Sequence, residues 1–316
     1  MKKYDIVALG ELLIDFTPDG CDNRGFPRYI RNPGGAVANV AAVLTKYGAS
    51  SALIGKVGQD TFGRYIRSFF TDIGVDCRGI IEDPVYNTTL AFVSLSENGD
   101  RDFTFYRRNE ADTKLTLEEV PIDMLQNTKI FHFGSLSLTA EPSRSATYSA
   151  LDTARTAGAL ISYDPNFRDS LWAGQDAVYY MNSVLERVDF IKVSEEEAVL
   201  MTGEHDPAAA AEKLLRKGIK FVAITLGARG AYIACDQCCG YIDPYEDVTT
   251  IDTTGAGDIF MGTILFEYLR NGFDSADRIW YAAHRASKSA ALSTQYKGGA
   301  TSIPAYAESR IDWSCL

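Results

Sequence analysis

The stretch Asp252-Thr253-Thr254-Gly255-Ala256-Gly257-Asp258 determines how the rest of the sequence is interpreted. An apolar run without proline follows it, from Ile259 to Leu269. Because this run is apolar on most faces and longer than a typical strand, it predicts a buried helix. The Gly-Ala-Gly segment then forms an entry with almost no side chains, where free first-turn amides can approach an outside group closely. Those amides and the positive end of the helix dipole favour an anion.

Asp258 stands at the rim of this predicted anion pocket. A carboxylate in that position suits phosphoryl transfer, since it can accept a proton from an alcohol while the amides hold the charge of the transferring phosphoryl group. An aspartate near a helix start is also a common cap of free amides. On local chemistry alone, catalysis and capping are therefore both open.

The composition narrows the class of protein. A chain of 316 residues with 46% hydrophobic content can bury a large core, as one large domain or two smaller ones. The net charge of −11 argues against nucleic acid and acidic membrane surfaces as partners. We see no signal peptide at residues 1–4 and no stretch as long as a membrane-spanning helix, and six cysteines fit a reducing compartment. We therefore expect a cytoplasmic protein.

The cysteines and histidines offer little support for a metal site. Cys235 and Cys238 have C-x-x-C spacing, with Cys239 beside them, and this spacing can bind zinc. A structural zinc site needs four ligands, however, and no second Cys or His pair lies nearby. The histidines are scattered, at His132, His205 and His284. We expect a hairpin with reduced thiols at about residues 235–240 rather than a zinc site.

Apolar strands alternate with helices along most of the chain. This pattern predicts a mainly parallel sheet with helices on both faces, and so an α/β fold. The expected strands are residues 6–10, 53–57, 130–133, 159–163, 190–193 and 221–225. Besides 259–269, the expected helices are one that opens within residues 32–41 and runs to about 47, and 61–73, 142–157, 207–217 and 275–292. We find no Walker-type G-x-x-x-x-G-K-[ST] and no G-x-G-x-x-G after the first strand, so a P-loop and a dinucleotide-binding oxidoreductase both lose support.

A different pattern interrupts the alternation before residue 107. Residues 90–95 and 101–106 flank Asn98-Gly99, a strong signal for a β-hairpin. With Ile80 and Ile81 before it, we expect a small antiparallel element inserted into the chain. Such an element suggests a lid over a site, at about residues 75–107 together with part of 12–33. An edge hairpin without a role and a dimer contact are the alternatives.

Polar residues follow several predicted strands. Asp15 lies just past the first strand, where open α/β sheets bind ligands. The pair Gly34-Gly35 precedes a helix that carries Asn39, whose amide offers donors and an acceptor suited to sugar hydroxyls. Ser194 and Glu197 have the spacing of a capping box. Each of these residues also has an ordinary structural interpretation.

The segment Asp252 to Asp258 resembles the more specific of the two signatures of the PfkB, or ribokinase-like, carbohydrate kinases, and residues 32–39 resemble the other. The resemblance extends over nearly the whole chain. Within the family it is strongest to bacterial fructokinases, in residues 10–15, 103–107, 192–197 and 297–304.

The resemblance implies a ribokinase-like α/β fold with a small β lid, in a single domain over residues 1–316. It implies an ATP-dependent kinase that phosphorylates D-fructose on the 6-hydroxyl, uses Mg²⁺ and responds to K⁺. A homodimer formed through the lid is expected. Within the family, a 2-keto-3-deoxygluconate kinase or another sugar or nucleoside kinase is the alternative. A sugar-binding regulator without catalysis is the alternative from another class, and the intact Asp258 with its Gly-Ala-Gly argues against it.

The family's functional residues map onto this sequence in four groups. The resemblance implies that Asp258 is the base, with the phosphoryl group held by Gly255, Ala256, Gly257 and Arg168. It implies a sugar site at Asp15, Gly34, Gly35, Asn39, Phe103, Arg107 and Asn166. The ATP site would comprise Lys192, Ser194, Thr225, Gly227 and Gly230. Glu197 would hold Mg²⁺ through water, and K⁺ would lie at Asp252, Gly298 and Ser302. Ser194 stands where many members have Asn, which weakens the metal assignment.

Overall fold

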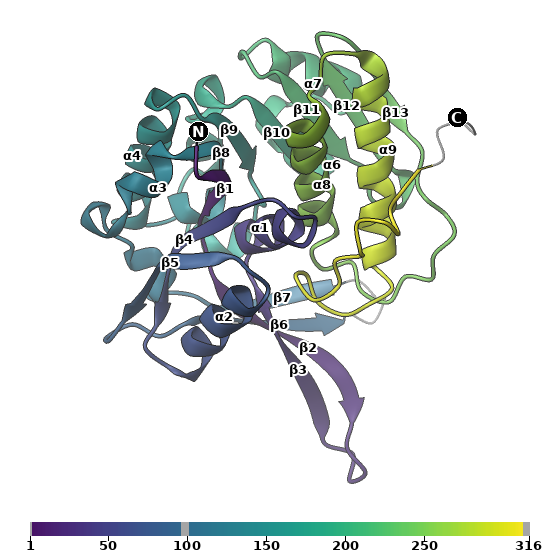
Figure 1. Ribbon diagram of the computed structural model, residues 1–316. Coiled ribbons are helices and arrows are strands. Elements are labelled where there is room, and N and C mark those ends of the chain that lie inside the picture. The colour runs from purple at the N-terminus through teal and green to yellow at the C-terminus, as the bar shows by residue number, and fades with distance from the viewer. Residues whose placement is uncertain (1, 96–100, 312–316) are drawn as a thin grey trace.

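The computed structural model describes residues 2–95 and 101–311. Within these ranges a sheet of nine strands runs through the body, in the order β13-β12-β11-β10-β9-β8-β1-β4-β5 (Figure 1). The pairs from β5 to β11 are parallel, and β12 and β13 add an antiparallel edge. The strands are β1 (Tyr4–Leu9), β4 (Ser51–Gly58), β5 (Asp76–Asp83), β8 (Thr128–Gly134), β9 (Leu160–Asp164), β10 (Phe190–Ser194), β11 (Phe221–Thr225), β12 (Ala231–Cys235) and β13 (Cys239–Ile242). The prediction of a mainly parallel α/β sheet is confirmed.

Helices cover both faces of this sheet because its buried strands present apolar side chains alternately to each side. In β1, Ile6 and Ala8 face one core, whereas Val7 and Leu9 face the other. The first face carries α1 (Ala36–Lys46), α2 (Thr61–Asp72), α8 (Ala256–Asn271) and α9 (Ala276–Ser293). The second carries α3 (Ile122–Gln126), α4 (Ser143–Thr156), α5 (Ala177–Asn182), α6 (Glu195–Thr202) and α7 (Pro207–Leu215). Short 3₁₀ helices are η1 (Ala111–Lys114), η2 (Leu117–Glu119), η3 (Ser135–Leu138), η4 (Asp169–Leu171), η5 (Leu185–Arg187) and η6 (Gly227–Arg229).

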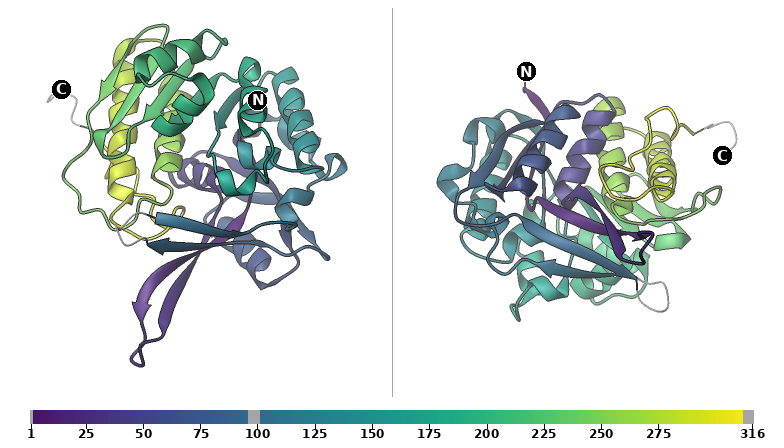
Figure 2. Two further views of the ribbon diagram at one scale, coloured as in Figure 1. Left: turned by 180° about the vertical axis from the view of Figure 1, so that it is seen from behind. Right: turned by 90° about the horizontal axis from the view of Figure 1, so that it is seen from below.

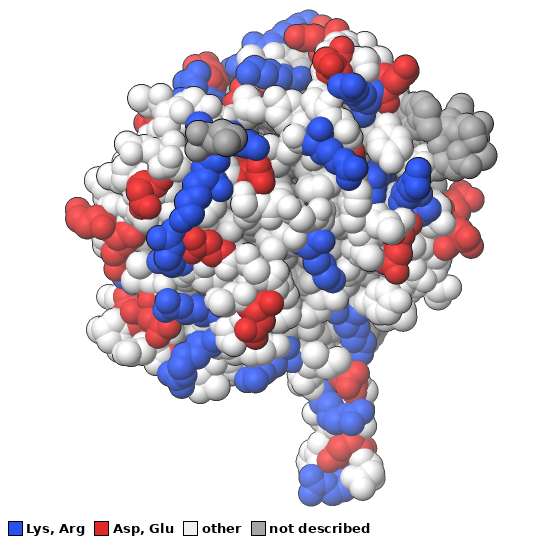
Figure 3. All heavy atoms as spheres, viewed as in Figure 1, with Lys and Arg blue, Asp and Glu red and all other residues white. Residues whose placement is uncertain are grey.

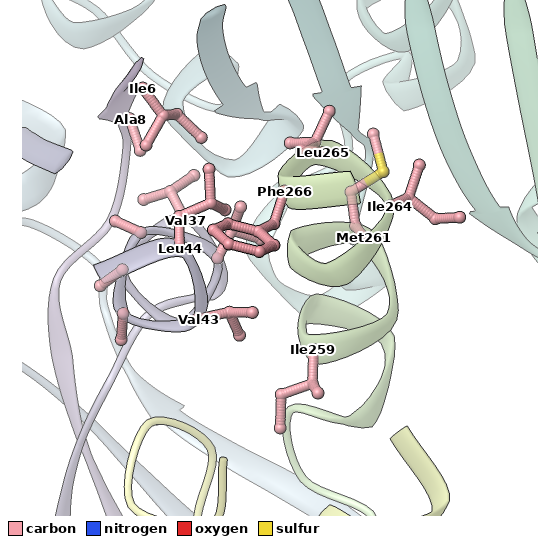
Figure 4. Close-up of a cluster of buried hydrophobic side chains, with 14 of the residues drawn as sticks. Ile6, Ala8, Val37, Val43, Leu44, Ile259, Met261, Ile264, Leu265 and Phe266 are labelled. Carbon is pink, nitrogen blue, oxygen red and sulfur yellow. The ribbon is translucent and has the colours of Figure 1, made fainter. Parts of the chain in front are cut away.

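Helix α8 is buried between α1 and α9, as its apolar sequence predicts. Apolar side chains of α1 and α8 meet in the core (Figure 4). At Gly262 a Cβ atom would lie 2.7 Å from that of Val43, so this glycine permits the close approach of the two helices. The helix begins at Ala256, earlier than the predicted residue 259, because Gly255 adopts a left-handed φ of 77° as its N-cap.

A second sheet of four strands lies against one end of the body, in the order β3-β2-β6-β7 (Figures 1 and 2). It comprises β2 (Leu13–Cys21), β3 (Pro27–Gly34), β6 (Thr89–Leu95) and β7 (Arg101–Tyr106). The predicted antiparallel pairing of residues 90–95 with 101–106 is confirmed in β6 and β7, and β2 joins β6 in parallel. The β2–β3 hairpin extends away from the body (Figure 1). The Asn98-Gly99 turn lies outside the described residues.

Residues 75–83 do not belong to this small sheet, contrary to the predicted lid boundary. Ile80 and Ile81 lie in β5, which pairs with β4 in the large sheet. Ile80 packs into the same core as Ile66 and Phe70 of α2. The apolar run is therefore an edge strand covered by a helix, and the second part of the small sheet starts only at Thr89.

The predicted hairpin near residue 235 is confirmed, with β12 ending at Cys235 and β13 beginning at Cys239. The described residues contain no group of three or more His, Cys, Asp or Glu side chains placed to hold a metal ion.

None of the helices in residues 2–95 and 101–311 is long and apolar enough to cross a membrane. On the face seen in Figure 3, basic and acidic side chains are interspersed rather than gathered by sign.

Candidate active site

A cavity of about 450 Å³ lies where the carboxyl ends of the parallel strands meet the small sheet. Its walls come from many elements: the segment after β1, strands β2 and β7, the starts of α1, α6 and α8, η3, and the loop after β9. The lining residues are Glu11, Leu13, Asp15, Gly35, Ala36, Asn39, Phe103, Phe105, Leu136, Asn166, Phe167, Arg168, Lys192, Ser194, Glu196, Glu197, Thr253, Thr254, Gly255, Gly257 and Asp258.

The start of α8 brings the predicted anion pocket to this cavity. A Cβ atom on Gly255 would lie 2.6 Å from Cα of Gly299, so only glycine fits there. A Cβ atom on Gly257 would lie 2.7 Å from Nζ of Lys192, so the missing side chain leaves room for an ammonium group. The resemblance implies that the amides of Gly255, Ala256 and Gly257 hold the phosphoryl group. The Ala256 amide already donates to the carbonyl of Thr253 at 3.2 Å. The start of α8 thus combines first-turn amides with a nearby cation.

Asp258 is buried in the first turn of α8. Its Oδ2 accepts a hydrogen bond from Nδ2 of Asn39 at 2.7 Å. Burial, followed by the charge of Asp164, raises the pKa of Asp258 to about 7, although Lys192 and the Asn39 bond act in the opposite direction. A carboxyl group with a pKa near neutrality is suited to accept a proton at physiological pH.

Lys192 and Asp164 form a buried ion pair beneath the cavity, with Nζ 2.8 Å from Oδ2. Burial acts to lower the pKa of Lys192, but the carboxylates of Asp164, Glu197 and Asp258 outweigh it and the net shift is upward. Lys192 is therefore a protonated cation next to Gly257. Its partner Asp164 ends β9 and was not among the predicted site residues. A carboxylate directly after a predicted strand was the available signal.

Two more carboxyl groups line the cavity. Asp15 is buried, and burial followed by the charge of Asp252 raises its pKa to about 7 while Arg168 acts to lower it. Glu11 is also buried, and burial raises its pKa. Its Oε1 accepts the Ala36 amide at 2.8 Å, whereas Oε2 has no hydrogen-bond partner in the described part of the chain. Glu11 was not predicted as a site residue.

The two adjacent glycines before α1 make room for these carboxyl groups. Gly34 is not part of the cavity wall, but a Cβ atom there would collide with Oδ2 of Asp15. Gly35 has a φ of 113°, and a Cβ atom on it would collide with the carbonyl of Glu11. The glycine pair therefore allows α1 to begin against both acidic residues.

Strand β7 supplies an aromatic wall. Phe103 and Phe105 both line the cavity and stack with ring centroids 5.9 Å apart, as the alternation of side chains along a strand predicts. The guanidinium of Arg168 lies 5.8 Å from the Phe103 ring centroid. Arg107 is not on the wall, although the resemblance placed it among the sugar contacts. Its guanidinium is buried and bonded to Asp112, Thr139 and Leu136.

Glu197 closes the predicted capping box with Ser194 at the start of α6. One carboxylate oxygen accepts the Ser194 amide at 2.7 Å and the other accepts the Phe167 amide at 2.6 Å. Glu197 thus ties α6 to the loop that carries Asn166 and Arg168. Its neighbour Glu196 also lines the cavity and was not predicted, because three consecutive glutamates at a helix start give no sign of which one faces a site.

A second cavity of about 620 Å³ adjoins the first at the start of α8. Thr253 and Gly257 line both. The predicted ATP-site residues Thr225, Gly227 and Gly230 line the second cavity, while Lys192 and Ser194 line the first. Gly230 has a φ of 87° and no room for a Cβ atom, which would collide with the carbonyl of Ile242. The site is therefore a pair of cavities that meet at the Gly-Ala-Gly segment.

The residues predicted for a monovalent cation lie together beside the site. Asp252 is buried, and its two carboxylate oxygens accept the amides of Thr254 at 2.8 Å and Gly298 at 3.0 Å. Ser302 donates from its hydroxyl to the carbonyl of Gly299 at 2.9 Å. Asp252 is thus bonded to Gly298, and Ser302 is bonded to the next residue of the same loop, Gly299.

Comparison with known proteins decides the family. The model of the pfkB family carbohydrate kinases matches residues 3–306. The chain belongs to the pfkB family of carbohydrate kinases. Fructokinase-1 of Zea mays is 38% identical over 312 residues, covering 96% of this chain and 95% of the relative. Fructokinase-1 of Oryza sativa subsp. japonica is likewise 38% identical over 312 residues, with the same coverage of 96% and 95%.

Solved structures agree with the family and the fold. The fructokinase of Vibrio cholerae O395 in its fructose-, ADP- and calcium-bound form has a TM-score of 0.88 and 33% identity, covering 97% of this chain and 98% of that one. The ATP-bound fructokinase of Xylella fastidiosa has a TM-score of 0.87 and 28% identity, covering 97% of each chain. The predicted ribokinase-like fold and the predicted kinase class are confirmed.

Proposed function

We propose that this pfkB-family kinase is a fructokinase, which transfers the γ-phosphoryl group of ATP to the 6-hydroxyl of D-fructose. The observation that carries the proposal is the placement of Asp258, a buried carboxyl with a pKa near 7, at the helix start where the two cavities meet. Support for fructose comes from the relatives named fructokinase and from the fructose-bound structure of one of them.

In this mechanism the sugar occupies the first cavity, where Asp15, Asn39 and Asn166 offer hydrogen bonds to its hydroxyl groups. The nucleoside of ATP occupies the second cavity, and its phosphates extend past Gly257 into the first. Asp258 accepts the proton of the attacking hydroxyl. The first-turn amides of α8 hold the charge of the transferring phosphoryl group, with Lys192 and Arg168 nearby. Phe103 and Phe105 exclude water from the reacting atoms.

Mg²⁺ would neutralise charge on the ATP phosphates in this reaction. Both oxygens of Glu197 already accept backbone amides, so its remaining lone pairs fit a contact to Mg²⁺ through water better than direct ligation. Glu196, on the cavity wall, is a second carboxylate within the same segment. Dependence on Mg²⁺ and stimulation by K⁺ at Asp252, Gly298 and Ser302 stay predictions.

The charge of the first cavity favours a neutral sugar over 2-keto-3-deoxygluconate. Glu11, Asp15, Glu196, Glu197 and Asp258 all line this cavity, and an acidic substrate would add a further carboxylate. Of the two cations on the wall, Lys192 is paired with Asp164. A sugar acid would therefore need a charge partner that the described wall supplies only through Arg168.

We also propose a homodimer formed through the small sheet. The β2–β3 hairpin extends from the body and exposes Phe26, Tyr29 and Ile30 (Figure 1). Large apolar side chains on one projecting hairpin are typical of a contact surface. The molar mass measured by light scattering after size exclusion checks this. The proposal predicts a dimer that a triple replacement of these residues by serine converts to a monomer.

The substrate proposal is tested by an ADP-release assay over D-fructose, ribose, tagatose, 2-keto-3-deoxygluconate and nucleosides. We expect fructose to have the highest kcat/KM, by about tenfold or more. NMR of the product should show phosphate on the 6-hydroxyl. A carboxylated sugar with the highest kcat/KM would overturn the substrate and leave the kinase class intact.

A further inference from the structure

A buried ion pair links the end of strand β7, which lines the proposed sugar site, to η1. Arg107 directly follows β7, and its Nε donates to Oδ2 of Asp112 at 2.6 Å. The side chains of Arg107 and Asp112 are only 2% and 0% exposed, so the contact is shielded from water. A buried pair of this kind is held in one geometry, and loss of one partner leaves the other charge unpaired.

Asp112 also holds strand β6, which pairs with β7. Its Oδ1 accepts the hydroxyl of Thr89, the first residue of β6, at 2.6 Å. One carboxylate thus joins the beginning of β6 to the end of β7. Both contacts lie at the open end of the hairpin, where Leu90 pairs with Tyr106, so Asp112 fixes that end of the strand that carries Phe103 and Phe105.

Arg107 also connects the end of β7 to η3, whose residue Leu136 lines the cavity. Its second guanidinium nitrogen donates to the carbonyl of Leu136 at 2.9 Å, and its first donates to the hydroxyl of Thr139 at 2.9 Å. Thr139 in turn donates to the same carbonyl of Leu136 at 2.8 Å. Leu136 lines the cavity, as do Phe103 and Phe105. The arginine therefore bridges two walls of the proposed sugar site without touching the cavity itself.

We propose that Asp112 is a positioning residue of the sugar site. Through Thr89 and Arg107 it holds Phe103 and Phe105 at a fixed separation from Leu136, and so sets the affinity for the sugar. This inference rests on the proposed function, because it takes the 450 Å³ cavity as the sugar site. It assigns to Arg107 an indirect role in place of a direct sugar contact.

The test compares Asp112→Asn with a matched variant, Glu267→Gln. Glu267 forms an equally buried ion pair with Arg285 at 3.2 Å and accepts the hydroxyl of Tyr306 at 2.9 Å, but it is not part of either cavity wall. Both variants break a buried ion pair and should lower the Tm. Only Asp112→Asn should raise the KM for D-fructose, by about tenfold or more, with the KM for ATP changed less than about twofold.

Thr89→Val provides a second, milder variant that leaves both charges paired and removes one hydroxyl contact. It should keep the fold and raise the fructose KM by a smaller factor, and calorimetric titration of fructose should show the same weakening without turnover. The inference is overturned if Asp112→Asn and Glu267→Gln have equal fructose KM values. It is also overturned if Thr89→Val binds fructose as tightly as the wild type when Asp112→Asn does not fold.

The wild-type substrate panel separates this inference from the proposed function. If the wild type rejects fructose but phosphorylates another sugar, the proposed function fails, and the same variants are compared with that sugar. If the wild type uses fructose and the variants do not differ in its KM, only the positioning role of Asp112 fails.

Discussion

Two groups of residues on the wall of the first cavity, Lys192, Gly257 and Asp258 (called the phosphoryl end) and Glu11 and Asp15 (called the sugar end), differ in how their charges are balanced. At the phosphoryl end, carboxylates lie with a buried lysine and helix amides, and Lys192 is 2.8 Å from Asp164. At the sugar end Glu11 and Asp15 are buried, and burial raises the pKa of each more than Arg107 and Arg168 lower it. The first arrangement suits a substrate group with negative charge, and the second suits neutral hydroxyls that both donate and accept hydrogen bonds. The contrast supports the proposed placement of the phosphate and the sugar.

The largest effect should come from Asp258→Asn, which removes the proposed base from the phosphoryl end. We expect kcat to fall by about 10²–10⁴, or about 3–5 kcal/mol of barrier, because the sugar hydroxyl loses its proton acceptor. Asn is nearly isosteric, so circular dichroism and the KM for fructose should change little. Near-normal kcat together with a lowered Tm would mean that Asp258 only caps α8.

Lys192→Met also acts at the phosphoryl end, where it removes a cation instead of the proposed base. We expect kcat to fall by about 10² because a cation beside the transferring phosphoryl group is lost. The matched control is Lys56→Met, since Lys56 is also buried and forms ion pairs with Asp83 at 2.8 Å and Glu119 at 2.7 Å, but lies on neither cavity wall.

Both lysine variants should lose stability, by about 3–5 kcal/mol in urea unfolding, because each leaves a buried carboxylate without its partner. Only Lys192→Met should lose turnover. Equal losses of kcat in the two variants would assign Lys192 a purely structural role.

Asp15→Asn should act on the sugar end alone. We expect the KM for fructose to rise by about 10- to 100-fold, since a buried acceptor of sugar hydroxyls is replaced by an amide that also donates. The KM for ATP should stay within about twofold of the wild type. A larger effect on ATP than on fructose would contradict the division of the cavity into two ends.

The same contrast explains what could be predicted from the sequence. The phosphoryl end comes largely from one continuous segment, residues 252–258, whose spacing and helix entry are visible in the sequence. The sugar end combines strands that are distant in the chain. Strand β2, for example, pairs with β6 although β3, α1, β4, α2 and β5 lie between them in the sequence. Local alternation predicted that Phe103 and Phe105 share a face, but it did not assign Ile80 to the large sheet, because pairing partners are set by tertiary packing.

Three residues show most clearly what could not be predicted from the sequence alone. Asp164 and Glu11 matter because of what lies opposite them after folding, namely Lys192 and the start of α1. Arg107 carried a family role in sugar contact, yet the structure directs its guanidinium to Asp112 and Leu136. Side-chain direction after a strand end depends on neighbours that the local sequence does not specify.

The pH dependence of kcat/KM for fructose tests the central claim, that Asp258 is the catalytic base, most directly. Asp258 must be deprotonated to accept a proton and its pKa is raised to about 7, so kcat/KM should rise with pH through about 7 and then level off. Asp15 has a similar pKa, and Asp15→Asn separates the two groups. We predict that this rise persists in Asp15→Asn and is absent from the residual activity of Asp258→Asn. A rise that persists unchanged in Asp258→Asn would contradict the account.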